Sequence, residues 1–250
     1  RGLMAKNAGH MVKNQYFVIP NYNWWGGYFY TIGLTIYNLL AGRLSLGASK
    51  YISKKKTIEL LPTVEEKGLV SGVIYHDGQF DDSRMAINIA QTAVEKGACL
   101  LNYSKVVGLL KDDKNQIIGV EVIDHETGHK YDIKGSAIIN ATGVFTNAIM
   151  KLNDTVYKKY IVPSQGIHLV FDKSFLPSNQ ALMIPKTSDG RVLFAVPWHN
   201  RIVVGTTDTL IRKHSLEPIA LESEIEFVLE TAQRFLAKKP TRADVLSVFA

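Results

Sequence analysis

The chain has 250 residues, of which 46% are hydrophobic and 21% charged, and it contains one cysteine. This composition is typical of a folded globular protein and excludes a disordered chain, while a single cysteine excludes an internal disulfide. The net charge of +6 comes from residues 1–60, which hold eight Lys and Arg and one Glu; the rest is nearly neutral and indicates no nucleic-acid partner.

Residues 1–61 are predicted to be helical and irregular, with a run of three lysines at 54–56. Ten aromatic residues lie among the cations of residues 1–60, and rings beside Lys and Arg are typical of a membrane–water interface. A packed helical element with a solvated basic end is the alternative. No stretch reaches the roughly 20 apolar residues that span a bilayer, and no leader peptide is visible. Because the chain opens without Met and ends in the apolar run 247–250, we expect an internal piece of a longer protein.

Residues 62–103 are predicted to contain short strands, a helix and a further strand. The β-type runs at 69–70 and 73–75 lie between Pro and Gly residues. The helix that follows is expected to be capped by Asp82 or Ser83 and to end at Gly97. Its apolar positions recur at helical spacing and are Met85, Ala86, Ile89, Ala90 and Ala93. Cys99–Tyr103 then predicts an apolar strand, in which Cys99 is a small buried hydrophobe.

Three further runs, 106–110, 117–123 and 130–133, are separated by short polar turns and predict an antiparallel meander. The apolar run Ala137–Ile139 predicts a strand parallel to the one at 99–103 and ends at Asn140-Ala141-Thr142-Gly143. Small residues at the carboxyl end of a buried strand allow a cofactor to approach the backbone. An ordinary strand-to-loop turn is the alternative interpretation.

From residue 160 onward, five short runs predict an antiparallel sheet: 161–162, 167–171, 181–184, 192–196 and 202–205. An amphipathic helix is expected to cross it, with an apolar face formed by Leu221, Ile225, Val228, Leu229, Ala232 and Leu236. His168 interrupts one apolar strand and should face away from Ile167 and Leu169. Thr206 and Thr207 present hydroxyls to a polar ligand, and Asp208 either joins them or caps a turn.

Several nucleotide and metal motifs are absent from the sequence. It contains no G-x-G-x-x-G, no G-x-x-x-x-G-K-[ST], no H-E-x-x-H and no Cys/His cluster. We therefore expect neither a metal site nor phosphate-loop nucleotide hydrolysis.

Five motifs occur in a fixed order over residues 62–250: Tyr75-His76-Asp77 with Asp81-Asp82-Ser83-Arg84, Ile139–Gly143, Ser164–His168, Phe194–Trp198 and Gly205–Asp208. Together they resemble the family of FAD-dependent glycerol-3-phosphate dehydrogenases. The first motif resembles that family's Y-x-D-x-x-x-D-D-x-R segment, the second its second flavin motif and the third its Lys-Gly-Ser-His strand. The last two resemble its P-W…G-T-T-D hairpin. Ser164-Gln165-Gly166 departs from the third pattern, and Val144 replaces the Pro common after Ala-Thr-Gly.

The resemblance implies an α+β fold. It combines part of an FAD-binding, glutathione-reductase-like α/β domain with a β-meander and an antiparallel-sheet substrate domain. The expected boundaries are 1–61 for the basic aromatic segment, 62–83 with 151–246 for the substrate domain, and 84–150 with 247–250 for the flavin domain. The family's G-x-G-x-x-G unit and His-Gly-Gly segment would precede residue 1, and its Gly-x-Arg-Pro segment would follow residue 250.

The resemblance also implies an activity, a cofactor and partners. FAD would oxidise sn-glycerol 3-phosphate to dihydroxyacetone phosphate and pass electrons to a quinone. The protein would then be cytoplasmic, peripheral on the inner membrane face, and a possible homodimer. The alternatives are a related flavin oxidase of the D-amino acid oxidase type, which uses oxygen, and a fragment without catalysis.

The resemblance assigns roles to individual residues. His168 would orient or deprotonate the substrate hydroxyl, and Thr206, Thr207 and Asp208 would line the substrate site. The residues implied to contact FAD are Val106, Ala141, Thr142, Gly143 and Trp198.

The missing glycine-rich loop gives a first prediction. Such a loop places the phosphates of a dinucleotide on a helix N-terminus. We therefore expect the 250-residue chain, purified alone, to be colourless. An absorbance spectrum checks this, and a yellow preparation with stoichiometric flavin would show the expectation to be wrong.

Overall fold

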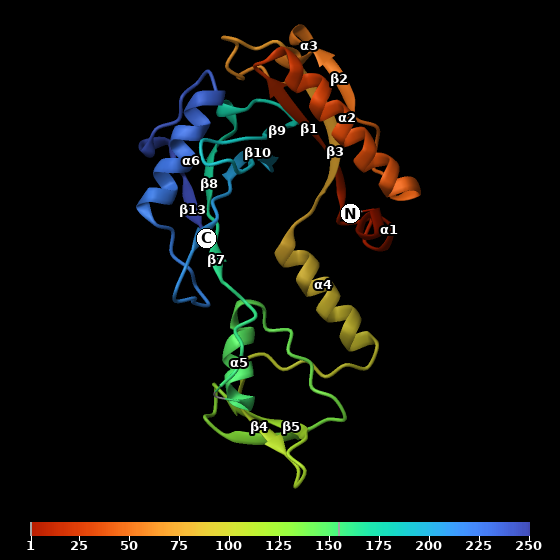
Figure 1. Ribbon diagram of the computed structural model, residues 1–250, viewed down its shortest axis with the longest axis vertical. Helices are drawn as coiled ribbons and strands as arrows, with labels where there is room; N and C mark the ends of the chain where they lie inside the picture. Colours follow the sequence, from red (N-terminus) through yellow and green to blue (C-terminus); the bar gives the residue numbers. More distant parts are fainter. Residues whose placement is uncertain (1, 155) are drawn as a thin grey trace. The chain divides into compact units, whose positions relative to one another are not determined.

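A computed structural model describes residues 2–154 and 156–250, which form two compact units (Figure 1). The first unit comprises Arg1–Met85, Gln165–Thr209 and Leu216–Ala250, and the second comprises Ala86–Ser164 and Leu210–Ser215. Helix α4 (Asp82–Glu95) begins in the first and continues in the second. The functional domain boundaries expected from the sequence stay a prediction.

The first unit is built on a mixed sheet of eight strands in the order β13-β8-β11-β10-β9-β1-β3-β2. All neighbours are antiparallel except β1 and β9, which are parallel. The strands are β1 (Lys13–Asn21), β2 (Lys50–Ser53), β3 (Ser71–Gln79), β8 (His168–Asp172), β9 (Ala181–Ile184), β10 (Leu193–Trp198), β11 (Arg201–Gly205) and β13 (Ser247–Phe249). Residues 247–249 thus join this sheet through β8.

Helices pack on both faces of this sheet (Figure 1). They are α1 (Gly2–Asn7), α2 (Trp24–Ala41), α3 (Lys54–Leu60) and α6 (Glu222–Phe235), with 3-10 turns at Gly42–Leu44, Lys173–Phe175 and Arg242–Asp244. On one face, α6 buries Ile225, Val228 and Ala232 in the main core. On the other face, Tyr30 and Leu34 of α2 pack on a smaller core that includes Phe17 and Tyr75. The amphipathic prediction for α6 is confirmed, except that Leu221 is exposed at its N-cap.

The second unit contains the predicted meander, which is confirmed: β4 (Ser104–Lys111), β5 (Ile117–Asp124) and β6 (Lys130–Lys134) form an antiparallel three-stranded sheet. Asn115 and Gly128 adopt positive φ in its two turns. A 3-10 turn (Gly143–Phe145) leads into α5 (Thr146–Asn153), which packs on β4. Two-residue strands β7 (Ser164–Gln165) and β12 (Thr209–Leu210) pair with each other.

The strands predicted at 99–103, 137–139 and 161–162 are wrong, because these residues are irregular in the structure. A strand is stable only when its backbone groups pair with a neighbour, and these runs have no partner strand among the described residues. Their side chains stay open to solvent: Ile139 is 87% exposed, and Cys99, predicted to be buried, is exposed.

The prediction that residues 1–61 are helical and irregular is wrong for Lys13–Asn21 and Lys50–Ser53, which form β1 and β2. Strand β1 is buried on both faces, since Phe17, Val18 and Ile19 are all buried in succession, so its sequence shows no alternation. The cap of α4 also differs from the prediction: the Asp81 carboxylate accepts from the Arg84 backbone N–H at 2.9 Å.

Candidate functional site

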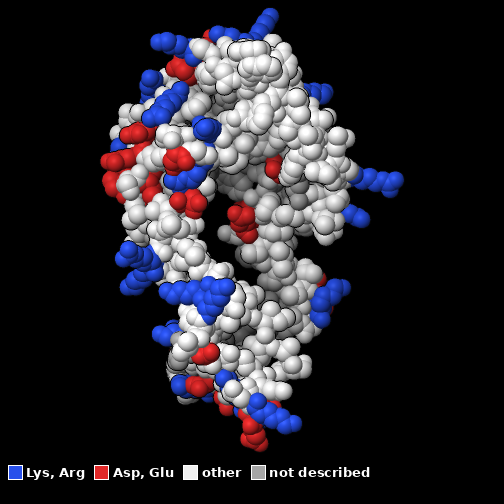
Figure 2. All heavy atoms as spheres, viewed as in Figure 1, with Lys and Arg blue, Asp and Glu red and all other residues white. Residues whose placement is uncertain are grey.

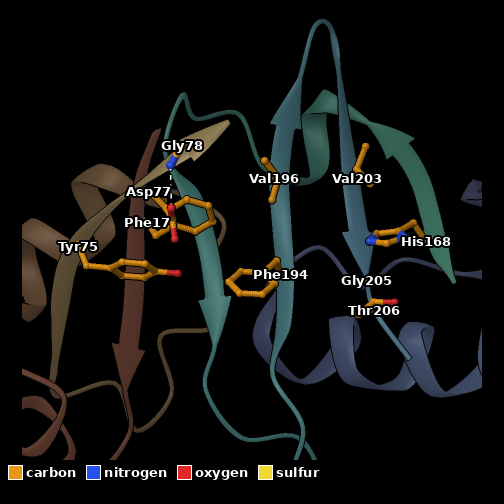
Figure 3. Close-up of a pocket in the computed structure, with 10 residues that line it drawn as sticks. All are labelled: Phe17, Tyr75, Asp77, Gly78, His168, Phe194, Val196, Val203, Gly205 and Thr206. Carbon is orange, nitrogen blue, oxygen red and sulfur yellow. Dashed lines mark hydrogen bonds between the residues drawn. The ribbon is translucent and has the colours of Figure 1, made fainter. Parts of the chain in front are cut away.

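A hollow of about 350 Å³ opens on the sheet face opposite α6 (Figure 3). Ten residues line it: Phe17, Tyr75, Asp77, Gly78, His168, Phe194, Val196, Val203, Gly205 and Thr206. They come from β1, β3, β8, β10 and β11 and the residue after β11. Alternate residues of a strand point to the same face, so Phe194 and Val196 face the hollow while Leu193 and Ala195 lie in the main core.

Aromatic side chains form one wall of the hollow. Phe17 stacks on Tyr75 with ring centroids 5.0 Å apart, and Phe194 meets Phe17 edge-on at 5.6 Å. Both contacts lie within the range in which aromatic pairs add stability beyond their buried area. The wall is therefore a preformed, largely apolar surface of the kind that lines small-molecule sites.

His168 lies at the start of β8 and faces away from Ile167 and Leu169, as predicted; these two residues are fully buried, and His168 faces the hollow (Figure 3). Its ring stacks on Phe249 with centroids 5.1 Å apart. Burial lowers the pKa of His168 from its usual value, and the nearby charge of Asp82 offsets part of this change. A neutral imidazole at neutral pH can accept a proton from a substrate hydroxyl.

Two glycines allow the close approach of His168 and Thr206. A Cβ on Gly205 would lie 2.5 Å from Cδ2 of His168 and 2.6 Å from the Ile167 carbonyl oxygen. A Cβ on Gly166 would lie 2.4 Å from Oγ1 of Thr206. Both positions therefore require the absence of a side chain. Gly205 pairs with His168 across the β11–β8 ladder, which fixes these two residues beside each other.

The structure brings His168 and Thr206 to the hollow but not the other residues predicted in the substrate site. Thr207 is buried and points to the opposite face, where its hydroxyl accepts from the Ile167 N–H at 3.0 Å and donates to Glu224 at 3.1 Å. Asp208 is exposed and lies outside the lining. Adjacent residues of an extended chain face opposite ways, so one Thr of the pair faces the hollow.

Trp198 lines a second hollow of about 340 Å³ at the ends of β3 and β10. Its ring meets that of His199 edge-on at 5.3 Å. The same lining includes Lys13, Arg84 and Lys173. Asp81 also lies in this lining, so Trp198 is beside charged groups of both signs and not on the wall that holds His168.

The remaining predicted cofactor contacts lie in the second unit. Ala141, Thr142 and Gly143 are exposed at the turn before α5, where Thr142 Oγ1 donates to Asn140 Oδ1 at 2.7 Å. Gly143 has a φ of 55°, which favours glycine. Val106 is half-buried in β4 beside a register shift between Val106 and Gly108. No group of three or more His, Cys, Asp or Glu among residues 2–154 and 156–250 could hold a metal ion.

Sequence reasoning missed the aromatic wall. Phe17, Tyr75 and Phe194 come from three different strands. Tyr75 and Phe194 lie within two of the motifs described above, but those motifs do not indicate that the two rings meet, and Phe17 lies in no motif. In β10, the alternation along the strand indicates that Phe194 and Val196 share one face of the sheet. It does not indicate which face of the sheet carries the hollow.

Comparisons with known proteins cover almost the entire chain. Residues 20–250 match the family described as FAD dependent oxidoreductase. The chain is 35% identical to "Glycerol-3-phosphate dehydrogenase, mitochondrial" of Schizosaccharomyces pombe and 38% identical to "Glycerol-3-phosphate dehydrogenase SDP6, mitochondrial" of Arabidopsis thaliana. Each match covers 100% of this chain and 40% of the relative, so the chain spans less than half of their length.

Solved structures give the same picture. A glycerol-3-phosphate dehydrogenase from Bacillus halodurans complexed with FAD superposes with a TM-score of 0.83 at 26% identity, over 99% of this chain and 45% of that one. An L-proline dehydrogenase from P. horikoshii superposes with a TM-score of 0.73 at 19% identity, over 99% of this chain and 62% of that one, which shows a shared fold alone.

Proposed function

The chain belongs to the family of FAD-dependent oxidoreductases, and we propose from this that the whole protein oxidises glycerol 3-phosphate to dihydroxyacetone phosphate. The observation that supports this substrate most directly is the similarity along the entire chain to glycerol-3-phosphate dehydrogenases, at 35–38% identity in the two relatives described above. We propose that the oxidation takes place at the hollow around His168 in the first unit.

The residues of the hollow fit a flavin ring. Phe17, Tyr75 and Phe194 provide a preformed apolar surface, and Gly205 allows His168 to lie close beside it. When bound, FAD supplies the acceptor for two electrons. We propose that this wall holds the ring. Contacts of Val106, Ala141, Thr142, Gly143 and Trp198 with the nucleotide stay predictions that the resemblance implies.

His168 carries the proton chemistry in this proposal. Oxidation of a secondary alcohol removes a hydride from carbon and a proton from the hydroxyl. A neutral ring nitrogen of His168 accepts that proton, and the apolar wall keeps bulk water away from the reacting carbon. Thr206 faces the same hollow, and its hydroxyl can orient the substrate oxygen by a hydrogen bond. We assign no direct substrate contact to Thr207.

An amine oxidase of the D-amino acid oxidase type is the second candidate. Its support is the fold: a glycine oxidase from Bacillus cereus superposes with a TM-score of 0.70 at 16% identity. Steady-state assays of the FAD-loaded whole protein with glycerol 3-phosphate, glycine and proline separate the two. The proposal predicts turnover of glycerol 3-phosphate, and turnover of the amino acids alone would contradict it.

We further propose that α2 contacts an anionic membrane in which a quinone accepts the electrons. Helix α2 contains no Asp, Glu, Lys or Arg, and Figure 2 shows mainly uncharged side chains over it. Its large exposed side chains are Trp24, Trp25, Tyr28, Phe29, Ile32, Ile36, Tyr37, Leu39 and Leu40. No helix in the described ranges, 2–154 and 156–250, is long and apolar enough to cross a bilayer. An exposed apolar stripe of this kind suits a helix that lies in the interface plane.

Lysines near α2 are the reason why we propose an anionic lipid surface. Tyr28 stacks on Tyr51 of β2 at 5.3 Å, and Lys50 precedes Tyr51 while Lys54–Lys56 follow β2. Lysines near an anionic surface contribute about 1 kcal/mol each. The resemblance further predicts a position on the cytoplasmic face of an inner membrane and a homodimer.

Liposome sedimentation tests the membrane proposal. Replacing Lys54, Lys55 and Lys56 with Gln is expected to weaken binding to anionic vesicles on the order of 100-fold, and Phe29→Glu with Ile32→Glu should remove most of it. Leu216→Glu is the matched control, since Leu216 is an exposed apolar residue outside α2. Equal binding of the wild type to neutral and anionic vesicles, or a loss in the control as large as that in α2, would contradict the proposal.

A further inference from the structure

We propose that Glu224 is a positioning residue, which holds the strands that carry His168 and Thr206 from the far side of the sheet. The catalytic part of this inference rests on the proposed function, while its structural part does not. Glu224 lies in the first turn of α6 and is 3% exposed, so its carboxylate is buried on the face opposite the hollow. A carboxylate is rarely buried to this extent unless it is fully hydrogen-bonded.

Uncharged donors surround the Glu224 carboxylate. Oε2 accepts from the Leu221 backbone N–H at 2.9 Å and from Gln165 Nε2 at 2.8 Å. Oε1 accepts from Thr207 Oγ1 at 3.1 Å. Burial raises the pKa of Glu224, but the hydrogen bonds from Leu221, Thr209, Gln165 and Thr207 outweigh it, and the net direction is down. The group is therefore ionised at neutral pH, and each bond to it is charge-assisted.

Two of these donors lie next to the residues of the hollow. Thr207 directly follows Thr206, and its hydroxyl also accepts from the Ile167 backbone N–H at 3.0 Å, one residue before His168. Gln165 lies three residues before His168, and its side chain also donates to the Ile219 carbonyl at 2.9 Å. One carboxylate thus connects the residues that lead into β8 with the residues that leave β11.

On the face that carries the hollow, the positions of His168 and Thr206 depend on this connection. Gly166 and Gly205 bring the two chain segments so close that a Cβ at either position would overlap Thr206 or His168. A small slide of one segment past the other would therefore displace both side chains in the hollow. Misplacement of about 1 Å in a reacting group can cost on the order of 100-fold in rate.

Glu224→Gln tests the inference in two independent ways. The variant amide places an N–H₂ group where donors now point at an oxygen, so at least one of the bonds from Leu221, Gln165 and Thr207 is lost. In the whole protein, amide hydrogen exchange at Ile167 should accelerate about 10-fold or more. In the FAD-loaded whole protein, kcat per bound flavin should fall about 10-fold, with KM changed less than about 3-fold.

Glu222→Gln is the matched control. Glu222 lies on the same helix, but its side chain is exposed and pairs with Arg242. It should leave both readouts unchanged. Thr207→Val removes the hydroxyl and should reproduce the Glu224→Gln effects. Thr207→Ser keeps the hydroxyl, so its Ile167 exchange rate and its kcat per bound flavin should be close to those of the wild type. This pair keeps the test decisive if Glu224→Gln fails to fold.

The outcomes separate the inference from the proposed function. A role in stability alone would lower Tm and the folded fraction but leave kcat per bound flavin and the Thr207→Val kinetics at wild-type values, which overturns the inference. So would an unchanged Ile167 exchange rate. If the wild type does not oxidise glycerol 3-phosphate, the proposed function fails, whereas the exchange experiment still decides whether Glu224 holds these strands.

Discussion

Replacing His168 with Ala in the FAD-loaded whole protein is expected to lower kcat/KM for glycerol 3-phosphate by about 10²- to 10⁴-fold. The reason is that His168 is the histidine that lines the hollow, and its lowered pKa keeps it neutral and ready to accept a proton. Steady-state kinetics normalised to bound flavin measure the change, so that loss of folded protein is not counted as loss of chemistry.

His168→Gln separates proton transfer from hydrogen bonding. Glutamine can still donate and accept hydrogen bonds, but it cannot act as a base near neutral pH. The Gln variant should therefore be nearly as slow as the Ala variant. If it folds, binds FAD and turns over at the wild-type rate, His168 does not accept the proton.

The pH dependence follows from the direction of the His168 pKa. Because burial places the folded pKa below its usual 6.5, the neutral base is present at pH 7 and is lost as the pH falls through the folded value. The unfolded state binds more protons between the two pKa values, so this group also makes the folded state more stable as the pH rises toward 6.5. The acidic limb of kcat/KM should lie below pH 6.5 in the wild type and disappear in His168→Gln.

Replacing Gly205 with Ala is expected to lower kcat/KM on the order of 100-fold, although it adds a single methyl group on the sheet. That methyl would lie 2.5 Å from the His168 ring and 2.6 Å from the Ile167 carbonyl oxygen. The Ile167 carbonyl can move away from the methyl group only if β8 moves with it, so the His168 imidazole is displaced from the hollow. The same overlap should destabilise the fold by about 1–3 kcal/mol.

Gly33→Ala is the control for this substitution. Gly33 lies within α2, where an added Cβ meets nothing within 4 Å. This variant should keep wild-type kinetics and be equally or slightly more stable, since Ala favours a helix over Gly. Thermal unfolding and kinetics of the two variants should be measured together. Wild-type kcat/KM in Gly205→Ala would show that the position of His168 does not limit the reaction.

Elements with a clear period could be predicted from the sequence. The spacing of Ile225, Val228 and Ala232 identified α6, and short polar turns identified the meander from 104 to 134. Strand β1 could not be recognised, because burial of Phe17, Val18 and Ile19 in succession removes the alternation that marks a half-exposed strand. The apolar runs at 99–103 and 137–139 have strand-like sequences, but pairing depends on a partner that sequence pattern alone does not supply.

The candidate site was predictable to a similar extent. His168 stands out because it interrupts an apolar strand, and the structure places it at the hollow. For the Thr206–Thr207 pair, the sequence motif does not distinguish the two hydroxyls. In the structure Thr206 faces the hollow, whereas Thr207 faces the opposite side of the sheet and donates to Glu224. The role inferred for Glu224 was not visible in sequence, because a glutamate in the first turn of a helix is expected on the solvent side.

Anaerobic mixing of the FAD-loaded whole protein with its substrate tests the proposed chemistry most directly. Glycerol 3-phosphate should bleach the visible absorbance of the flavin in the wild type, and the same step should be slowed about 10²-fold or more in His168→Gln. Glycine and proline should leave the absorbance unchanged. Bleaching by either amino acid without bleaching by glycerol 3-phosphate, or an equal rate in His168→Gln, would contradict the assignment of this hollow as the site of alcohol oxidation.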